Sequence, residues 1–565
     1  MELTGAQILM ECLKREGVDT IFGYPGGAVI ELFDEMSRHA DVLKPILVRH
    51  EQGAVHAADG YSRASGRTGV CLVTSGPGAT NAVTGIATAY CDSIPMVVFT
   101  GQVPTKLIGN DAFQEVDIVG ITRPCTKHNY LVKDIKALAG TIRQAFYLAR
   151  SGRPGPVLVD LPKDVVLAST DFVWPEEVRM RSYNPNYKPN LVQLRRAAEL
   201  LVQAKQPLFM VGGGVVGSNA SDVITDMAMR YQIPVASTLM GLGAFPCTHS
   251  LWCGMVGMHG TVTANKAVTD ADVLVAVGTR FADRVTGKLS AFASHSRIIH
   301  IDIDPTSIRK NVNVEVPVVA DCREAVIGLS DVLAARAGEK DWMKEHAAWL
   351  GIIARNKEEH PLTYVKNGEI KPQQVIEIVN ELVKDDDVII ATEVGQHQMW
   401  AAQFFKYSKP RTFLTSGGLG TMGYGLPAAM GAQIAMPDKR VICIAGDGSI
   451  QMNSQEFATI VQNRLPVKVI ILNNCYLGMV RQWQELFFKQ NYVCTCMDGQ
   501  PDFVKLADAY GAEGYRISEM DDLVPTLKKA LTSPNPAIVD VRVAREENVY
   551  PMVPAGKALD EMLLV

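Results

Sequence analysis

The chain reads VICIAGDGS at residues 441–449 and VKVIILNN at residues 467–474, with a helix-compatible segment between them. Both apolar runs are short and end in Gly, Asp or Asn, which is typical of buried parallel strands in α/β units. Glycines let a backbone approach a diphosphate closely, and a following helix N-terminus offers free N–H groups. Asp447 and Asn474 add two hard oxygen ligands from neighbouring strand ends, which suits Mg²⁺. A lone Gly-Asp-Gly would favour a simple tight turn, but the paired spacing predicts a diphosphate and magnesium site.

Similar apolar runs recur in three groups along the 565 residues. The first group lies at 70–74, 96–100 and 157–160, the second at 208–211, 273–277 and 298–301, and the third at 388–390, 441–444, 467–472 and 537–539. Two polar stretches, 182–190 and 355–371, separate the groups and indicate linkers. We therefore expect three doubly wound α/β domains with mainly parallel sheets, over residues 1–185, 186–365 and 366–565. Such sheets bind ligands beyond the carboxyl ends of their strands.

Composition excludes several classes of protein. A formal net charge of −5 gives no basic surface for nucleic acid. The apolar runs are too short to cross a membrane, and no basic segment followed by a long apolar stretch marks a signal peptide. Eleven cysteines without an export signal indicate free thiols in a reducing compartment. A cytoplasmic protein is expected.

The paired turns resemble those of thiamine-diphosphate-dependent enzymes. That resemblance makes the backbone carbonyl of Tyr476 the third protein ligand of the metal, beside Asp447 and Asn474. It also makes Glu51 the carboxyl group that activates the cofactor's aminopyrimidine ring, because the segment from Val48 to Tyr61 is similar to the activating segment of that family. The full set of residues that the resemblance assigns to thiamine diphosphate is Pro25, Glu51, Gly395, Gln396, His397, Gly420, Met422, Asp447, Gly448, Ser449, Asn474, Leu477, Gly478 and Met479.

Further motifs resemble the biosynthetic acetohydroxyacid (acetolactate) synthases. They lie at residues 22–28 (FGYPGGA), 74–81 (TSGPGATN), 151–157 (SGRPGPV), 417–425 (GGLGTMGYG) and 478–483 (GMVRQW). In the middle domain, Gly212–Gly217 alone is an ambiguous dinucleotide fingerprint or a glycine-rich turn. The segments 257–261 and 278–289 are similar to FAD-contacting segments of this family, so the resemblance implies an FAD site. Its residues would be Arg153, Gly212, Gly213, Gly214, Thr238, Leu239, Met240, Met258, His259, Gly278, Arg280, Asp283, Arg284, Asp302 and Asp321.

The same resemblance implies a transferase of branched-chain amino-acid biosynthesis. Pyruvate would lose carbon dioxide on thiamine diphosphate, and its two-carbon remainder would join a second pyruvate or 2-ketobutyrate, giving acetolactate or acetohydroxybutyrate. Gln114 and Lys163 are assigned catalytic roles, and Arg284, Trp483, Gly27, Ala28 and Phe113 bind substrate. A homodimer or homotetramer with its active site between subunits, a small regulatory subunit and a C-terminal lid at 551–556 are also implied. The alternatives are an FAD-dependent pyruvate oxidase, a nucleotide-binding regulatory protein and a nicotinamide dehydrogenase.

Overall fold

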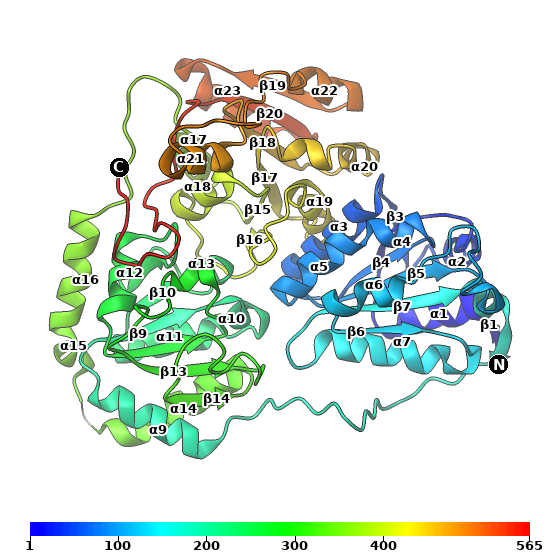
Figure 1. The fold of residues 1–565 in the computed structure, drawn as a ribbon, viewed down its shortest axis with the longest axis horizontal. Coiled ribbons are helices and arrows are strands. Elements are labelled where there is room, and N and C mark those ends of the chain that lie inside the picture. Colours follow the sequence, from blue (N-terminus) through cyan, green and yellow to red (C-terminus); the bar gives the residue numbers. More distant parts are fainter. Residues whose placement is uncertain (339) are drawn as a thin grey trace.

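The structure is a computed structural model that describes residues 1–338 and 340–565, and within these residues it contains three parallel six-stranded sheets. The expected fold class, three doubly wound α/β units, is confirmed. Figure 1 shows the three units as separate lobes: the N-terminal unit in blue and cyan, the middle unit in green and the C-terminal unit in yellow to red.

The N-terminal sheet has the strand order β3-β2-β4-β5-β7-β6. Its central strands, β4 and β5, are wholly buried, and helices cover both faces. A short antiparallel pair, β1 with β8, ties the start of the chain to the unit's last strand. The elements are β1 (Glu2–Thr4), α1 (Gly5–Arg15), β2 (Thr20–Tyr24), α2 (Ile30–Ser37), β3 (Lys44–Leu47), α3 (Glu51–Ser65), β4 (Gly69–Val73), α4 (Pro77–Asn81), α5 (Val83–Asp92), β5 (Met96–Gln102), α6 (Ile118–Thr122), β6 (His128–Leu131), α7 (Ile135–Arg150), β7 (Pro156–Pro162), α8 (Lys163–Leu167) and β8 (Ser169–Asp171).

The middle sheet has the order β11-β10-β9-β12-β13-β14 and its own hydrophobic core. Among the described residues, no helix or strand lies between Asp171 and Leu191, and this extended segment leads into the middle unit (Figure 1). The elements are α9 (Leu191–Gln203), β9 (Pro207–Val211), α10 (Gly213–Gly217), α11 (Ser221–Tyr231), β10 (Val235–Ser237), β11 (Trp252–Met255), α12 (Val262–Asp270), β12 (Val273–Val277), α13 (Asp283–Thr286), β13 (Arg297–Asp302), β14 (Val316–Val319), α14 (Cys322–Ala337), α15 (Trp342–Glu345) and α16 (Ala347–Glu359). Because α16 continues to Glu359, the first residues of the stretch read as a second linker are helical.

The C-terminal sheet has the order β16-β15-β17-β18-β20-β19. The strand expected before the Gly-Asp-Gly turn is β17, and the strand before Asn474 is its neighbour β18, so both turns lie at one sheet edge. The elements are α17 (Pro372–Leu382), β15 (Val388–Thr392), α18 (Gln396–Phe404), β16 (Phe413–Leu414), α19 (Gly425–Ala435), β17 (Arg440–Gly446), α20 (Glu456–Gln462), β18 (Lys468–Asn473), α21 (Gly478–Phe487), α22 (Phe503–Tyr510), β19 (Glu513–Ile517), α23 (Met520–Thr532) and β20 (Ala537–Arg542).

The N-terminal and C-terminal units share one hydrophobic core, built around the crossing of α3 and α19. The two helices approach backbone to backbone: a Cβ built on Gly431 would lie 1.8 Å from the carbonyl oxygen of Ala57, and one built on Gly60 would lie 2.1 Å from that of Ala428. Only glycine permits this approach. After β20 the chain returns to the middle unit, where Val553 donates a backbone hydrogen bond of 2.7 Å to the Met258 carbonyl (Figure 1).

Within the described residues, no helix combines the length and the apolar character that a membrane span requires.

Candidate active site and cofactor cavity

Glu51 begins α3 at the carboxyl edge of the N-terminal sheet and is 9% exposed. Asn81 Nδ2 donates a hydrogen bond of 2.9 Å to Glu51 Oε2, and a Cβ on Gly78 would lie 3.3 Å from Oε1. His50 caps the helix, because its imidazole accepts the Gln52 N–H at 3.1 Å. The carboxyl group is therefore fixed at a helix N-terminus, where the helix dipole favours it, and small residues leave room for a ligand beside it.

Other candidates from the N-terminal unit surround this edge. Lys163, the first residue of α8, donates to the Gly27 carbonyl at 2.9 Å and pairs with Glu31 at 3.3 Å. Gln114 packs against Gly76, because a Cβ there would lie 2.9 Å from the Gln114 Cα. Gly27 and Ala28 follow Pro25 in the loop after β2, and the Ala28 Cβ faces Gly101. The side chain of Phe113, by contrast, is 89% exposed.

The Gly446–Ser449 turn closes on itself, since the Gly446 N–H donates to Ser449 Oγ at 3.3 Å. Asp447 is 1% exposed, and burial raises its pKa to about 7. A buried carboxylate without a bound cation pays a desolvation cost, so this aspartate suits a metal ligand. Gly448 has no room for a side chain, because a Cβ would lie 2.6 Å from Leu477.

Asn474 lies one strand away and donates to Gln396 Oε1 at 3.3 Å. The side-chain oxygen Oδ1 of Asn474 accepts the Tyr476 N–H at 3.1 Å, which folds the chain before α21. A Cβ on Gly478 would collide with Gln396, so Gly478, Leu477 and Asn474 form one tight turn against α18. Across residues 1–338 and 340–565 there is no cluster of three or more His, Cys, Asp or Glu side chains for a metal. The donor set here is different: one carboxylate, one amide and one backbone carbonyl, which suits Mg²⁺ shared with phosphate oxygens.

His397 supports a phosphate ligand at this turn. Burial lowers its pKa to about 3, so the imidazole is neutral. Its Nε2 is buried and has no hydrogen-bond partner within the described chain. A Cβ on Gly446 would lie 2.7 Å from the ring, so the imidazole faces the diphosphate turn. An unpaired buried polar atom is costly unless a ligand completes it. The residues at this edge therefore fit thiamine diphosphate.

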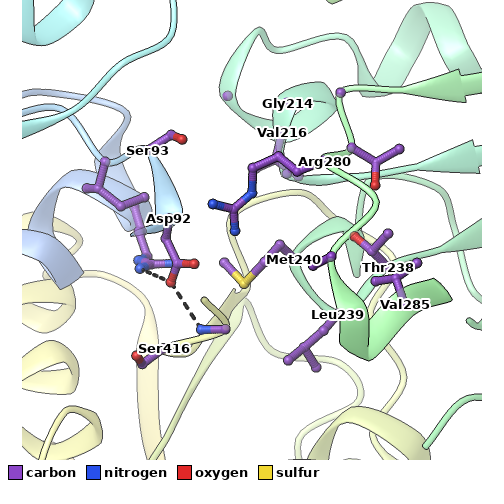
Figure 2. Close-up of a pocket in the computed structure, with 18 of the residues that line it drawn as sticks. Asp92, Ser93, Gly214, Val216, Thr238, Leu239, Met240, Arg280, Val285 and Ser416 are labelled. Carbon is purple, nitrogen blue, oxygen red and sulfur yellow. Dashed lines mark hydrogen bonds and ion pairs between the residues drawn. The ribbon is translucent and has the colours of Figure 1, made fainter. Parts of the chain in front are cut away.

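A cavity of about 650 Å³ opens where the three units meet (Figure 2), within the range of small-molecule and cofactor sites. Most of the residues that resemblance assigns to FAD line it: Arg153, Gly213, Gly214, Thr238, Leu239, Met240, Met258, His259, Gly278, Arg280, Arg284, Asp302 and Asp321. Gly212 and Asp283 are outside this lining in the described residues. Gly212 instead packs against Gly278, since a Cβ would lie 2.3 Å from the Gly278 oxygen.

The chemistry of the cavity wall fits a dinucleotide. Arg153 and Arg280 supply positive charge, while Asp302 and Asp321 supply acceptors. Asp321 caps α14 by accepting the Arg323 and Glu324 N–H groups, and burial raises its pKa. Burial also lowers the pKa of His259 to about 4, so this side of the cavity carries a neutral imidazole. The mix of cations, acceptors and apolar side chains such as Met240 and Leu239 suits phosphates, ribose hydroxyls and a flat ring system.

The same cavity reaches the C-terminal unit. Gly395, Gly420, Met479 and Trp483 lie in its wall together with Arg284. The Arg284 guanidinium pairs with Asp283 at 3.1 Å and its side chain is 63% exposed, so it is free to bind a carboxylate. Trp483 packs edge-on against Phe487. Glu51, Gln114 and Lys163 do not line this cavity in the described chain, so one protomer does not bring all candidates into one pocket.

Several cavity residues were missed by the sequence reading, chiefly Ser62, Arg63, Asp92, Ser93, Arg411 and Ser416. They carry no motif of their own. Arg63 and Asp92 meet only because α3 and α5 pack side by side, at 2.9 Å between Arg63 Nη2 and Asp92 Oδ2. In the sequence, Arg63 and Asp92 stand out only as charged residues among small and apolar ones, and this does not predict which residue each one contacts.

Comparison with known proteins assigns this architecture. The central part of the chain, residues 194–329, matches the thiamine pyrophosphate enzyme central domain. Residues 3–121 match the N-terminal TPP-binding domain, and residues 393–541 match the C-terminal TPP-binding domain. The chain is thus a thiamine-pyrophosphate enzyme by all three of its units.

Its relatives narrow the class. The acetolactate synthase large subunit of Parasynechococcus marenigrum is 50% identical over 99% of this chain and 91% of its own length. The acetolactate synthase isozyme 3 large subunit of Escherichia coli is 48% identical over 100% and 98%. Chloroplastic acetolactate synthase 1 of Nicotiana tabacum is 47% identical over 99% and 84%. The chain belongs to the acetolactate synthase family, and the expectation from its motifs is confirmed.

Proposed function

We propose that this chain decarboxylates pyruvate and joins the two-carbon remainder to a second pyruvate, giving acetolactate, or to 2-ketobutyrate, giving acetohydroxybutyrate. One observation carries the proposal. The wall that holds Arg284 and Trp483, the candidates for the second keto acid, also holds Gly395, Gly420 and Met479 of the thiamine unit. A second substrate bound there lies beside the cofactor rather than at a separate site.

The candidate residues would bind three ligands: Mg²⁺, thiamine diphosphate and FAD. Asp447, Asn474 and the Tyr476 carbonyl hold Mg²⁺, and His397 and the Gly446–Ser449 turn hold the diphosphate. Arg280 and the Gly213–Gly214 turn would hold FAD in the cavity, where its role would be structural, since the net reaction transfers no electrons to it. Bound thiamine diphosphate supplies the nucleophilic carbon and the electron sink that decarboxylation requires.

The chain's own residues would position the cofactor and the substrates and would control the protonation of the pyrimidine ring. Glu51, held by Asn81, keeps a carboxyl group against the pyrimidine ring nitrogen and so sets which ring nitrogens carry protons. Met422, in the loop before α19, would pack against the bound cofactor as an apolar support. Arg284 binds the carboxylate of the second keto acid through its guanidinium fork. Trp483 flanks that substrate and excludes water, while Gln114, Lys163 and Phe113 border the entrance.

We place the complete active site between two subunits. This assignment is supported by the separation of Glu51 and its neighbours from the cavity of the same chain, and by the exposure of Phe113, which a partner subunit would cover. The relatives are named large subunits, and a small regulatory subunit is accordingly proposed as a partner. We further propose a cytoplasmic location, units divided near residues 185 and 365, and closure of the site by residues 551–556.

The test is acetolactate formation from pyruvate by the purified chain with thiamine diphosphate, Mg²⁺ and FAD. Glu51→Gln should lower turnover by roughly 10²- to 10⁴-fold, as loss of a general acid–base group does, while thiamine diphosphate still binds. Glu199→Gln, an exposed carboxylate paired with Arg336 on the surface, is the matched control and should retain full activity. Equal turnover in wild type and Glu51→Gln would refute the assignment.

A pyruvate oxidase would use the same two cofactors but would pass electrons to flavin. Anaerobic mixing with pyruvate separates the two activities. Acetolactate with oxidised flavin supports the synthase, whereas bleached flavin with acetate or acetyl phosphate would mean an oxidase. The family relatives do not favour that alternative.

A further inference from the structure

The C-terminal end of α5 is where all three units touch. The Cys91 carbonyl accepts a hydrogen bond from Arg280 Nη1 of the middle unit. The Asp92 carboxylate accepts the N–H groups of Gly417 at 3.0 Å and Gly418 at 2.8 Å, from the C-terminal unit. Ser93 Oγ accepts Arg153 Nε at 2.8 Å. Figure 2 shows Asp92 and Ser93 on one side of the cavity, with Arg280 and Met240 facing them.

Asp92 is held with little freedom. Its side chain is fully buried, and besides the two glycine N–H groups it pairs with Arg63 at 2.9 Å. Arg63 also pairs with Asp59 at 2.5 Å, and Asp59 accepts the Tyr424 hydroxyl at 2.6 Å. Burying such charges is costly unless each is paired and hydrogen-bonded. The network therefore fixes α3 and α5 of the N-terminal unit to both ends of the 416–424 loop.

This loop leads directly to the candidate thiamine site. Gly420 lies in the cavity wall with Val394 and Gly395, and Gly395 in turn packs against His397, which faces the diphosphate turn. At the far end of the loop, Gly423 N–H donates to Glu393 Oε2 at 2.7 Å. A second tie from α5 joins Thr88 Oγ1 to Thr421 Oγ1 at 2.8 Å.

The loop also contacts a residue of the cavity wall that comes from the middle unit. Met240 packs on Gly417 so closely that a Cβ there would lie 2.3 Å from its sulfur. Met240, Arg280 and Arg153 all line the cavity. A nucleotide bound in the cavity would contact these three side chains, which in turn contact Gly417, Cys91 and Ser93, and would thereby link α5 to the loop.

We propose that Asp92 is a positioning residue that couples flavin-nucleotide binding in the cavity to thiamine-diphosphate binding, through Gly417 and Gly418. The inference rests on the two cofactor sites of the proposed function. Coupling of two binding sites is reciprocal: each ligand raises the affinity of the other by one common factor.

The experiment measures the dissociation constant of thiamine diphosphate with Mg²⁺, by tryptophan quenching, in FAD-free and FAD-saturated protein. FAD should tighten wild-type binding by a factor within the roughly 5- to 150-fold range of typical coupling. In Asp92→Asn one of the two side-chain atoms facing the glycine N–H groups becomes a donor. The ratio of the thiamine diphosphate dissociation constants without and with FAD should then fall to within about twofold of one. Thiamine diphosphate should likewise no longer raise the affinity for FAD.

Glu199→Gln is the matched control, because it makes the same carboxylate-to-amide change at a surface residue that pairs with Arg336 and does not line the cavity in the described structure, and it should keep the wild-type factor. Thr88→Val, which removes the second tie and preserves side-chain shape, should lower the factor partially and serves if Asp92→Asn does not fold. Unchanged coupling in Asp92→Asn and Thr88→Val, or no coupling in the wild type, would overturn the proposal. Both constants are measured without turnover, so a chain that binds both cofactors with coupling but makes no acetolactate would refute only the proposed function.

Discussion

The crossing of α3 and α19 gives a prediction whose sign depends on backbone geometry. Gly431→Ala adds one methyl group 1.8 Å from the Ala57 carbonyl oxygen, whereas Cβ contacts in proteins are essentially never under 3.0 Å. The helices must separate by about 1.2 Å, and neither a side-chain rotation nor a flexible neighbour can absorb this shift because the obstacle is backbone. Overpacking of a core costs about 1–3 kcal/mol, and a backbone collision lies at or above the upper end.

Alanine also favours helix over glycine by about 1 kcal/mol, so the expected net loss is at least about 2 kcal/mol. Gly351→Ala is the control: it lies in the interior of α16, is exposed, and has no atom within 4 Å of an added Cβ in the described structure. In this variant only the higher helix propensity of alanine acts, and it should raise the free energy of unfolding by about 1 kcal/mol.

Thermal unfolding of both variants provides the assay, with the dissociation constant of thiamine diphosphate as the second readout. Gly431→Ala should lower the midpoint and weaken cofactor binding, because α3 carries Glu51 and α19 follows the loop with Met422. Gly351→Ala should raise the midpoint and leave binding unchanged. If both substitutions shift stability in the same direction, the close approach of the two helices is not what their glycines provide.

Three further predictions concern single side chains. Burial raises the pKa of Glu456 to about 7, from 4.5, so its ionisation destabilises the fold as pH rises from about 4.5 to 7. Glu456→Gln keeps an oxygen that can accept the Arg49 and His50 N–H groups. Between pH 5 and pH 8 the variant should lose less stability than the wild type, by about 2 kcal/mol from the linkage relation. If variant and wild type lose the same stability over this pH range in thermal unfolding, Glu456 does not have a raised pKa. Asp447→Asn should weaken Mg²⁺-dependent thiamine diphosphate binding by more than about 100-fold, the upper cost of losing an outer partner of a metal ligand, and calorimetry that finds native affinity would remove it from the site. Arg284→Lys should raise the KM for the second keto acid with little change in thiamine diphosphate affinity, since lysine cannot form a bidentate pair, and initial-rate kinetics with an unchanged KM would assign Arg284 elsewhere.

The sequence predicted the central strands of each six-stranded sheet but none of the edge strands, and it also missed the inner strands β2 and β10. Strands such as β4 and β12 are buried along their whole length and consist of uninterrupted apolar runs. The edge strands β3 (KPIL), β6 (HNYL) and β19 (EGYRI) are partly exposed and carry polar residues or proline. Their pairing is determined by the neighbouring strand rather than by their own composition, so no local pattern marks them.

The candidate site residues also fall into those that a local motif predicts and those that only tertiary packing brings together. Residues that lie on a turn after a strand, such as Asp447 and Asn474, were predicted because a local spacing fixes them at one sheet edge. Asp92 and Gly417 are 325 positions apart, and nothing near either residue indicates the other. Their contact is a result of tertiary packing. Phe113 is 89% exposed in the single chain, so the substrate-binding role proposed for it would need a surface supplied by a second subunit.

The distribution of cores suggests where the molecule can respond to its ligands. The N-terminal and C-terminal units share a core through α3 and α19, so they behave as one packed body. The middle unit has a core of its own, joins the C-terminal unit through smaller apolar contacts such as Leu242 and Val553, and meets both other units around the cavity. Close-packed interiors resist small displacements, whereas polar interfaces between domains adjust more readily. Cofactor binding should therefore act mainly on the cavity wall and on the 416–424 loop. That loop lies in the cavity wall at Gly417 and, beside Val394 and Gly395, at Gly420, so the proposed coupling between the two sites would need no movement of the shared core.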